Sequence, residues 1–229
     1  MERKPLTAAR SALTPIKKTR TAAEEVEERL ILAIAMGDKA PGERITEAEI
    51  ARALDVSRVP VREAMQKLLL RGVLTESGQR GLRVLDYSGK WIAEVFELRM
   101  AIERIIFQHV MAVEDRSALI EDLERIVARM AAVGESADPV SLSSADLEFH
   151  RTVARHAGSK LTAQIWEGLA QHLMIVFCRD WSRAPNRAGE VQLHEELVAY
   201  LRNGSIDDLD EVLRYHFSGP GVRPPAESS

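Results

Sequence analysis

The first part of the chain carries apolar residues at helical spacing behind residues that favour a helix start. Val26, Leu30 and Ile34 fall on one face of a helix with 3.6 residues per turn. Thr21 precedes this segment and Glu24 follows it by three positions, which is the spacing of a capping box. The pattern predicts an amphipathic helix that begins after Thr21.

Two further helices are predicted after the first. Thr46 and Glu49 repeat the capping-box spacing and indicate the start of a short helix. Ser57 is a candidate N-cap for the third helix, and Pro60 falls in its first turn, where a missing N–H costs nothing. Gly72 is placed to end that third helix.

Two short runs rich in branched residues follow, with a turn bounded by glycines between them. They cover 73–76 and 82–85 and predict a β-hairpin. Three helices and a hairpin are the order of a winged helix-turn-helix. In such a wing, Arg80 and Arg83 on either side of Gly81 are placed to reach a phosphate or the minor groove.

The rest of the chain shows helical periodicity almost throughout. We expect helices at 88–112, 116–133, 139–157, 160–180, 187–202 and 206–217. Ser205 and Asp208 have capping-box spacing at the last of them. The predicted fold class is mainly α: a winged helix-turn-helix of three helices plus a β-hairpin, joined to an all-helical antiparallel bundle. The expected parts are a mobile basic arm (1–20), a DNA-binding domain (21–86), an effector, metal-binding and dimerisation domain (87–217) and a flexible tail (218–229).

Charge and composition narrow the class of protein. Residues 1–86 hold 16 Lys and Arg against 13 Asp and Glu, whereas residues 87–229 hold 15 against 22. A basic front and an acidic rear suit a chain in which only the front meets a polyanion. The single cysteine, Cys178, excludes an internal disulfide and fits a reducing cytoplasm. We expect no membrane segment or secretion signal, because no apolar run approaches the roughly 18 residues that span a bilayer.

The third helix carries the candidate base-reading residues. In a helix-turn-helix, the first turn of the second helix of the motif enters the major groove. Arg58 and Arg62 lie one turn apart at this place, and a bidentate arginine on guanine is the commonest specific base contact. The alternative is that both arginines form a solvated helix face near Glu63.

This region resembles the winged-helix domain of the GntR superfamily. The residues that carry the resemblance are Pro41-Gly42, Ile45-Thr46-Glu47, the run Val-Ser-Arg-Val-Pro-Val-Arg-Glu-Ala over 56–64, Leu68 and Gly81. By position, the resemblance implies DNA contacts by Ser57, Arg58, Val59, Arg62 and Gly81. Some relatives have an arginine where this chain has Ala48, so the resemblance implies no particular operator sequence.

Ionisable residues interrupt the apolar stripes of the predicted bundle. Asp146 and His150 lie four residues apart on one helical face, so both can reach one metal ion. His194 and His216 lie on the apolar stripes of two later helices and would complete the set. Such nitrogen and oxygen ligands suit Zn, Ni, Mn, Fe or Cu better than Ca or Mg. The alternatives are ordinary core histidines, or a ligand set that includes His109, His156 or His172.

The same region resembles the FCD effector domain of the FadR branch of that superfamily. The resemblance is carried by Leu98-Arg99, Glu103, Asp-Leu-Glu-Phe-His over 146–150, His-Glu-Glu-Leu over 194–197, Gly204, Asp207 or Asp208, and His216. In metal-binding members the ligands occupy the positions of Asp146, His150, His194 and His216, which implies a divalent transition metal (Zn, Ni, Mn or Fe). Where relatives often read Ser-Gly-Asn, this chain has Gly158-Ser159-Lys160, so an asparagine contact is not implied.

Arg99 interrupts an otherwise apolar stripe of the predicted helix 88–112. A buried guanidinium needs an anionic partner. Glu103, one turn further along, is one candidate. The other is the carboxylate of a small effector whose second oxygen reaches the metal, and the family resemblance favours such an organic acid.

These patterns indicate an effector-responsive transcription regulator rather than an enzyme. The family resemblance implies a cytoplasmic homodimer that binds a short palindromic operator in double-stranded DNA and acts as a repressor of carbon-source or organic-acid catabolism. A carboxylate effector would shift its DNA affinity through the helix at 88–112. One alternative is a metal-responsive regulator. Another is a metal-dependent enzyme, for which no general base is evident because helical phase turns Glu148 and Glu195 away from the ligand stripes.

Overall fold

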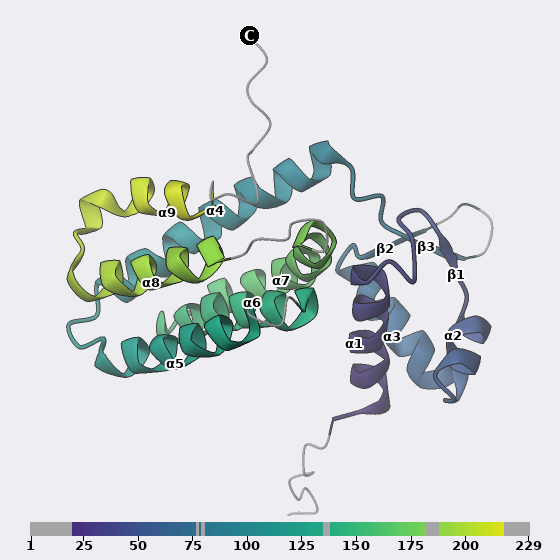
Figure 1. Cartoon of the computed structure of the whole chain (residues 1–229). Helices are drawn as coiled ribbons and strands as arrows, with labels where there is room; N and C mark the ends of the chain where they lie inside the picture. Colours follow the sequence, from purple (N-terminus) through teal and green to yellow (C-terminus); the bar gives the residue numbers. More distant parts are fainter. Residues whose placement is uncertain (1–19, 77, 79–80, 135–137, 182–187, 218–229) are drawn as a thin grey trace, which may run out of the picture.

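The computed structural model describes residues 20–76, 78, 81–134, 138–181 and 188–217. Its first part is a winged helix with the elements α1 (Ala22–Ala35), β1 (Arg44–Ile45), α2 (Glu47–Ala53), α3 (Arg58–Leu70), β2 (Leu74–Glu76) and β3 (Leu82–Val84). Strand β3 lies between β1 and β2, and both strand pairs are antiparallel. These elements form the right-hand end of the molecule in Figure 1.

Strand β1 is an element that the sequence pattern missed, because only a hairpin of β2 and β3 was expected. Arg44 pairs with Arg83 and Ile45 with Leu82. Gly42 precedes this strand with φ +75°, in the left-handed region that glycine favours. Ile45 is fully buried, so the third strand covers part of the winged-helix core.

The helix starts follow the predicted caps in part. Thr21 accepts from the N–H of Glu24, and the Glu24 carboxylate accepts from the N–H of Thr21, so this capping box is confirmed. Thr46 accepts from the N–H of Glu49 at 3.3 Å, as predicted. The Glu49 carboxylate pairs with Lys39 instead of closing the second box, so that half of the prediction is wrong.

The described remainder of the chain is helical. Its elements are α4 (Gly89–Met111), α5 (Ser117–Gly134), α6 (Pro139–His156), α7 (Lys160–Trp181), α8 (Ala188–Asn203), the 3-10 turn η1 (Ile206–Asp208) and α9 (Leu209–Phe217). Helix α6 packs against both α5 and α7, and α4 packs on α7 and α9 (Figure 1). A winged helix joined to a helical bundle confirms the predicted fold class. Ser205 caps η1 through the N–H of Asp207, so the last α-helix starts at Leu209 rather than at the predicted 206.

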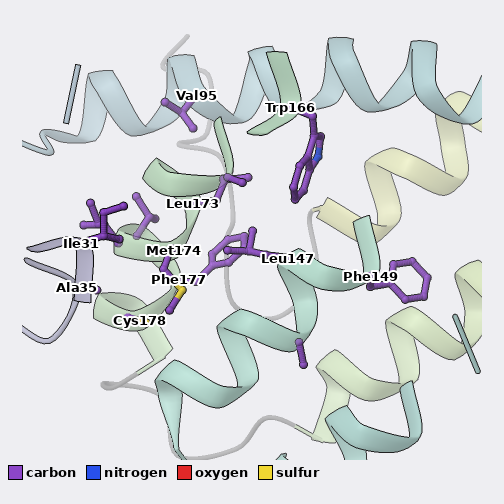
Figure 2. Close-up of a cluster of buried hydrophobic side chains, with 14 of the residues drawn as sticks. Ile31, Ala35, Val95, Leu147, Phe149, Trp166, Leu173, Met174, Phe177 and Cys178 are labelled. Atoms are coloured by element: carbon purple, nitrogen blue, oxygen red, sulfur yellow. The ribbon is translucent and has the colours of Figure 1, made fainter. Parts of the chain in front are cut away.

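One buried core runs through both parts of the molecule. Trp166 and Phe149 are among the largest fully buried side chains of the bundle. Figure 2 shows Ile31 and Ala35 of α1 beside α7, which contributes Met174 to the same cluster. The winged helix therefore packs on the bundle through α1 and α7, in addition to its covalent connection through α4.

Several predictions fall outside the described residues. These are the arm up to residue 19, Arg80 in the wing and the tail from 218 onward. Among the residues that the structure describes, no helix is both long and apolar enough to cross a membrane.

Candidate functional site

Helix α3 presents its first turn to solvent. Ser57, Arg58 and Val59 are exposed, whereas Val61 and Ala64 on the opposite face are buried. Ser57 occupies the N-cap position, but its side chain makes no hydrogen bond to the helix, so the predicted capping bond is absent. The burial pattern turns the candidate DNA-contacting residues outward on a helix whose back is fixed in the core.

Arg62, one turn further along α3, is held by a residue of the preceding helix. Its Nε and Nη2 donate to Oε1 and Oε2 of Glu47 at 2.8 and 2.9 Å. The sequence alternative named Glu63 as the acidic neighbour. Arg62 and Glu47 are 15 positions apart, so the packing of α2 on α3 decides the pairing.

In the wing, Gly81 and Arg83 lie against the segment that precedes α2. Arg83 Nη1 donates to the carbonyl oxygen of Gly42 at 2.9 Å. A Cβ at Gly81 would lie 2.8 Å from Arg44 Nε, so the bare backbone leaves room for that side chain. Arg44 is a basic residue at the wing that the sequence analysis did not single out, because strand β1 was not predicted.

The bundle brings the four candidate metal ligands together in its interior. Asp146 and His150 come from α6, His194 from α8 and His216 from α9. All four are buried, and one ring nitrogen of each histidine lies within 4.8 Å of the other two. Three helices therefore converge on a group of three imidazoles with a carboxylate beside it.

The donor atoms of this cluster face one another. Asp146 Oδ1 lies 3.2 Å from His194 Nε2, and His150 Nε2 lies 3.3 Å from His216 Nε2. Two atoms bound to one ion at about 2.1 Å lie roughly 3.0 to 3.4 Å apart, which matches these spacings. His194 Nδ1 lies 2.7 Å from the carbonyl oxygen of Glu190, and this contact orients the ring so that Nε2 faces the carboxylate of Asp146. Imidazole nitrogens and a carboxylate at these spacings can share one cation, so the donor set fits a transition metal.

Arg99 and Glu103 of α4 line the same centre. Arg99 Nε donates to Glu103 Oε1 at 2.7 Å, and Trp166 Nε1 donates to the same oxygen at 3.2 Å. The other oxygen of Glu103 pairs with His150 Nδ1. Arg99 Nη2 lies 3.8 Å from Asp146 Oδ2 and has no hydrogen-bond partner among the described residues. Glu103 is thus the partner of Arg99 in this structure, and one edge of the guanidinium is left for a further anion.

These contacts set the charges in the centre. Burial would raise the pKa of Glu103, but His150 and Arg99 outweigh it and lower that pKa to about 2. Burial also opposes ionisation of Asp146, yet a side-chain hydrogen bond and the charge of Arg99 lower its pKa to about 2. Burial lowers the pKa of His150 and of His216, so both imidazoles are neutral near pH 7. Carboxylates and neutral imidazoles are the protonation states that bind a metal.

The other three histidines of the chain lie outside this centre. His109 is exposed on α4. His156 Nε2 lies 3.2 Å from a carboxylate oxygen of Asp122. His172 Nε2 lies 2.8 Å from the carbonyl oxygen of Arg71, at the junction of the winged helix and the bundle. The structure therefore groups His150, His194 and His216 and leaves the alternative ligands apart.

Helix α7 connects this centre to the end of α3. Trp166 donates to Glu103 in the centre, and His172, further along the same helix, contacts Arg71, the C-cap residue of α3. The Tyr87 hydroxyl lies 3.3 Å from the other ring nitrogen of His172. The sequence analysis expected the helix at 88–112 to link the two parts. In the structure α7 also bridges them.

An outward-facing arginine helix with a wing, joined to an all-helical bundle, defines a class of DNA-binding transcription regulators. The chain belongs to the GntR family within that class and carries an FCD domain. The model for bacterial regulatory proteins of the gntR family matches residues 22–84, and the FCD domain model matches residues 94–219. The predicted family is confirmed, and so is the expectation of a regulator rather than an enzyme.

Relatives of the chain are operon regulators. It is 28% identical over 196 residues to the probable D-xylose utilization operon transcriptional repressor of Paenarthrobacter nicotinovorans. The aligned residues cover 86% of this chain and 85% of the relative. It is 30% identical over 144 residues to the gluconate operon transcriptional repressor of Bacillus subtilis (strain 168). That match covers 63% of this chain and 58% of the relative.

Solved structures share the fold. E. coli McbR/YncC superposes with a TM-score of 0.73 at 17% identity, over 86% of this chain and 94% of that one, and shows the fold alone. A putative transcriptional regulator GntR from Rhodococcus sp. RHA1 superposes with a TM-score of 0.64 at 25% identity, over 84% of this chain and 91% of that one. The combination of winged helix and bundle is therefore common to these proteins.

Proposed function

We propose that this GntR-family regulator is an effector-responsive repressor with a metal and a small carboxylate in its bundle. It acts in the cytoplasm as a homodimer on a short palindromic operator in double-stranded DNA. The observation that carries the proposal is the buried cluster of donor atoms beside an arginine whose Nη2 has no hydrogen-bond partner among the described residues. The family assignment supplies the DNA-binding part.

The proposed DNA contacts lie on α3 and the wing. Arg58 and Arg62 read guanines in the major groove, and the start of α3 directs its N–H groups toward a phosphate. The exposure of this helix face supports the assignment. The wing follows the backbone or the minor groove. The proposed contacts are Ser57, Arg58, Val59, Arg62, Arg80, Gly81 and Arg83.

The proposed cofactor is a divalent transition metal, Zn, Ni, Mn or Fe. Such an ion supplies a Lewis-acid centre for an oxygen of a bound ligand. The chain contributes ring orientation, since the carbonyl oxygen of Glu190 holds one imidazole and the carboxylate of Glu103 holds another. The residues that would hold the metal are Asp146, His150, His194 and His216.

The proposed effector is a small organic acid. Glu103 binds Arg99 through Nε, so the guanidinium is fixed while its Nη2 edge stays available to a second carboxylate. Such a charge-assisted pair is strong in a buried site. The relatives include repressors named for a D-xylose utilization operon and a gluconate operon, and gluconate is itself a carboxylate.

The proposed dimer uses apolar side chains exposed on the bundle. Leu98 and Ile105 on α4, and Leu161 and Ile165 on α7, are between 40% and 67% exposed. Helices α4 and α7 pack against each other. Exposed apolar side chains gathered on neighbouring helices favour a partner surface, and a palindromic site needs two copies of the winged helix.

The proposed regulation runs through α7. An effector carboxylate bound at the Nη2 edge of Arg99 would change the charge beside Glu103 and so alter the contact of Glu103 with Trp166. The same helix holds the end of α3 through His172, so a shift of α7 would reach the recognition helix. Such coupling requires that the effector bind the DNA-competent and DNA-incompetent states unequally.

A thermal-shift screen of organic acids on the metal-loaded protein tests the proposal. An acid at 100 times its Kd should stabilise the protein by about 2.7 kcal/mol, and the same acid should shift operator affinity. Arg99→Ala should abolish both effects. Arg104→Ala, an exposed arginine on the same helix paired with Asp210, is the matched control and should retain them. Equal responses to acids and neutral sugars, unchanged by Arg99→Ala, would contradict the carboxylate effector.

A second candidate is a metal-responsive regulator. The existing pair between Arg99 and Glu103 favours it, because the guanidinium already has an anionic partner without an effector. Metal titrations of DNA binding, with and without organic acids, separate the two functions. If metal alone switches operator binding at sub-micromolar free concentration, the ion is the effector.

A further inference from the structure

We infer that Glu47 is a positioning residue for base recognition, which fixes the guanidinium of Arg62 so that its opposite edge is presented to a guanine. The inference rests on the proposed function, in which Arg62 contacts DNA. It adds a residue of α2 to those that decide sequence preference, although Glu47 itself touches no base.

The carboxylate of Glu47 occupies one edge of the guanidinium. The Nε–H and one N–H of Nη2 donate to its two oxygens at 2.8 and 2.9 Å. An arginine carries five N–H donors in one plane, so two on Nη1 and one on Nη2 remain. These point away from the carboxylate, along the end of the Arg62 side chain. Guanine offers N7 and O6 in the major groove, the pair of acceptors that such an edge binds.

The pair lies where a duplex would meet α3. The Arg62 side chain is 63% exposed, and Arg58 lies one turn earlier on the same helix. A hollow of about 250 Å³ opens between α3 and the wing, and its lining includes Glu47, Arg62, Gln66 and Gly81. The carboxylate thus orients Arg62 at the edge of the space between the recognition helix and the wing.

Glu47 is itself held in place by α2. It is the first residue of that helix, directly after the N-cap Thr46, whose side chain accepts from the N–H of Glu49. Helix α2 packs on α3, so the carboxylate approaches Arg62 from a fixed direction. The hydrogen bond from Arg62 lowers the pKa of Glu47, so the carboxylate is ionised and remains an acceptor at neutral pH.

The value of this pair lies in recognition rather than in folding. An exposed ion pair contributes little to stability, because water screens it and two side chains must be ordered. A guanidinium already held in one plane loses less freedom when it binds a base. A carboxylate near DNA also repels phosphate, so removal of Glu47 should strengthen non-specific binding while it weakens base discrimination. A purely electrostatic effect would not produce this opposite pair of changes.

The experiment uses the full chain and double-stranded DNA. Selection from a random library gives the preferred site, and Arg62→Ala identifies the guanine that depends on Arg62. Replacing that guanine by 7-deazaguanine removes the N7 acceptor and should weaken wild-type binding about tenfold. In Glu47→Gln, the guanine and 7-deazaguanine sites should bind with nearly the same affinity. Glu49→Gln is the control: it removes the same charge from the same helix and breaks the pair with Lys39, but it should still bind the 7-deazaguanine site more weakly than the guanine site.

The outcomes separate this inference from the proposed function. The double variant Glu47→Gln/Arg62→Ala should discriminate between the guanine and 7-deazaguanine sites no worse than Arg62→Ala alone. Thermal unfolding midpoints should be unchanged in all variants. If Glu47→Gln discriminates like the wild type while Arg62→Ala does not, the inference is overturned and the proposed function stands. A selected site with no guanine dependent on Arg62 also overturns it. If the wild type selects no sequence, the proposed function fails and the inference with it.

Discussion

Two arginine–glutamate pairs with nearly equal Nε–oxygen distances lie in opposite surroundings. Arg62 Nε lies 2.8 Å from Glu47 on the proposed DNA-binding face, and Arg99 Nε lies 2.7 Å from Glu103 inside the bundle. The side chains of the first pair are 63% and 34% exposed, and those of the second 4% and 1%. Water can replace either partner of the first pair but neither partner of the second. The exposed pair can therefore meet DNA through the open edge of its guanidinium, whereas the buried pair is part of the fold.

Removal of one partner from the buried pair should give the largest effect. Glu103→Ala removes the carboxylate that Arg99 hydrogen-bonds in the core and should lower the free energy of unfolding by about 3–5 kcal/mol. Urea denaturation of the metal-free protein measures it. The double variant Arg99→Met/Glu103→Leu removes both charges and should recover part of the loss, because Trp166 and His150 still lack the Glu103 carboxylate. A loss below 1 kcal/mol for Glu103→Ala would mean that the two pairs do not differ in kind.

Acid should destabilise the buried pair and spare the exposed one. The pKa of Glu103 falls from its usual 4.5 to about 2, so its contribution is present above pH 4.5 and is lost as the pH falls toward 2. A shift of this size corresponds to on the order of 3 kcal/mol. His150 and His216 add a loss in the same direction below about pH 6.5, because burial lowers their pKa values and the unfolded chain takes up protons that the native state does not.

Unfolding free energies of the metal-free protein between pH 7 and pH 3 test this dependence. Glu47→Gln should follow the wild-type curve, while Arg99→Met/Glu103→Leu should show a shallower one below pH 4.5. Parallel curves for the wild type and the double variant would contradict the assignment of the acid sensitivity to the buried pair.

Metal binding should stabilise the protein through the buried histidines and not through an exposed one. A metal at 100 times its Kd should raise the unfolding free energy by about 2.7 kcal/mol. His216→Ala should abolish the increase, because His216 supplies a donor atom to the cluster. His109→Ala removes an exposed histidine from α4 and is the matched control. Chelator titration followed by thermal unfolding gives the readout, and equal responses of both variants would contradict the site.

The smallest effect on stability should come from the DNA-binding face. Arg58→Ala removes an exposed side chain and should change the unfolding free energy by less than about 0.5 kcal/mol. The same change should reduce discrimination between bases by about 1–3 kcal/mol. Competition binding between the selected site and single-base variants measures it. Full discrimination by Arg58→Ala would show that Arg58 reads no base.

The amino-acid sequence allowed much of this fold to be predicted, because local signals decided it. The caps at Thr21 and Thr46 and the helical spacing of apolar residues located most helices within a few positions. The candidate metal ligands could also be predicted from the sequence, because Asp146 and His150 share a helix face and the later histidines interrupt apolar stripes. Such signals depend on neighbours within one or two turns.

Features that depend on packing between elements could not be predicted in this way. Strand β1 has two residues, and its pairing with β3 depends on partners almost forty positions away. Glu47 pairs with Arg62 only because α2 packs on α3 at that point. Trp166 reaches Glu103 from a helix more than fifty residues later. No periodicity within one segment reports such a contact, so α7 remained unrecognised as a link between the two parts.

The packing of α1 on α7 bears on how hybrid regulators can arise. Two separate family models cover the two parts, which suggests units that recombination could exchange freely. Here, however, Ile31 of α1 lies against the cluster that includes Met174, and Gln171 donates to Glu27 across the same seam. A chimaera that inherits the winged helix from one parent and the bundle from another must also inherit matched halves of this seam. Without them it would expose apolar surface on both sides of the junction.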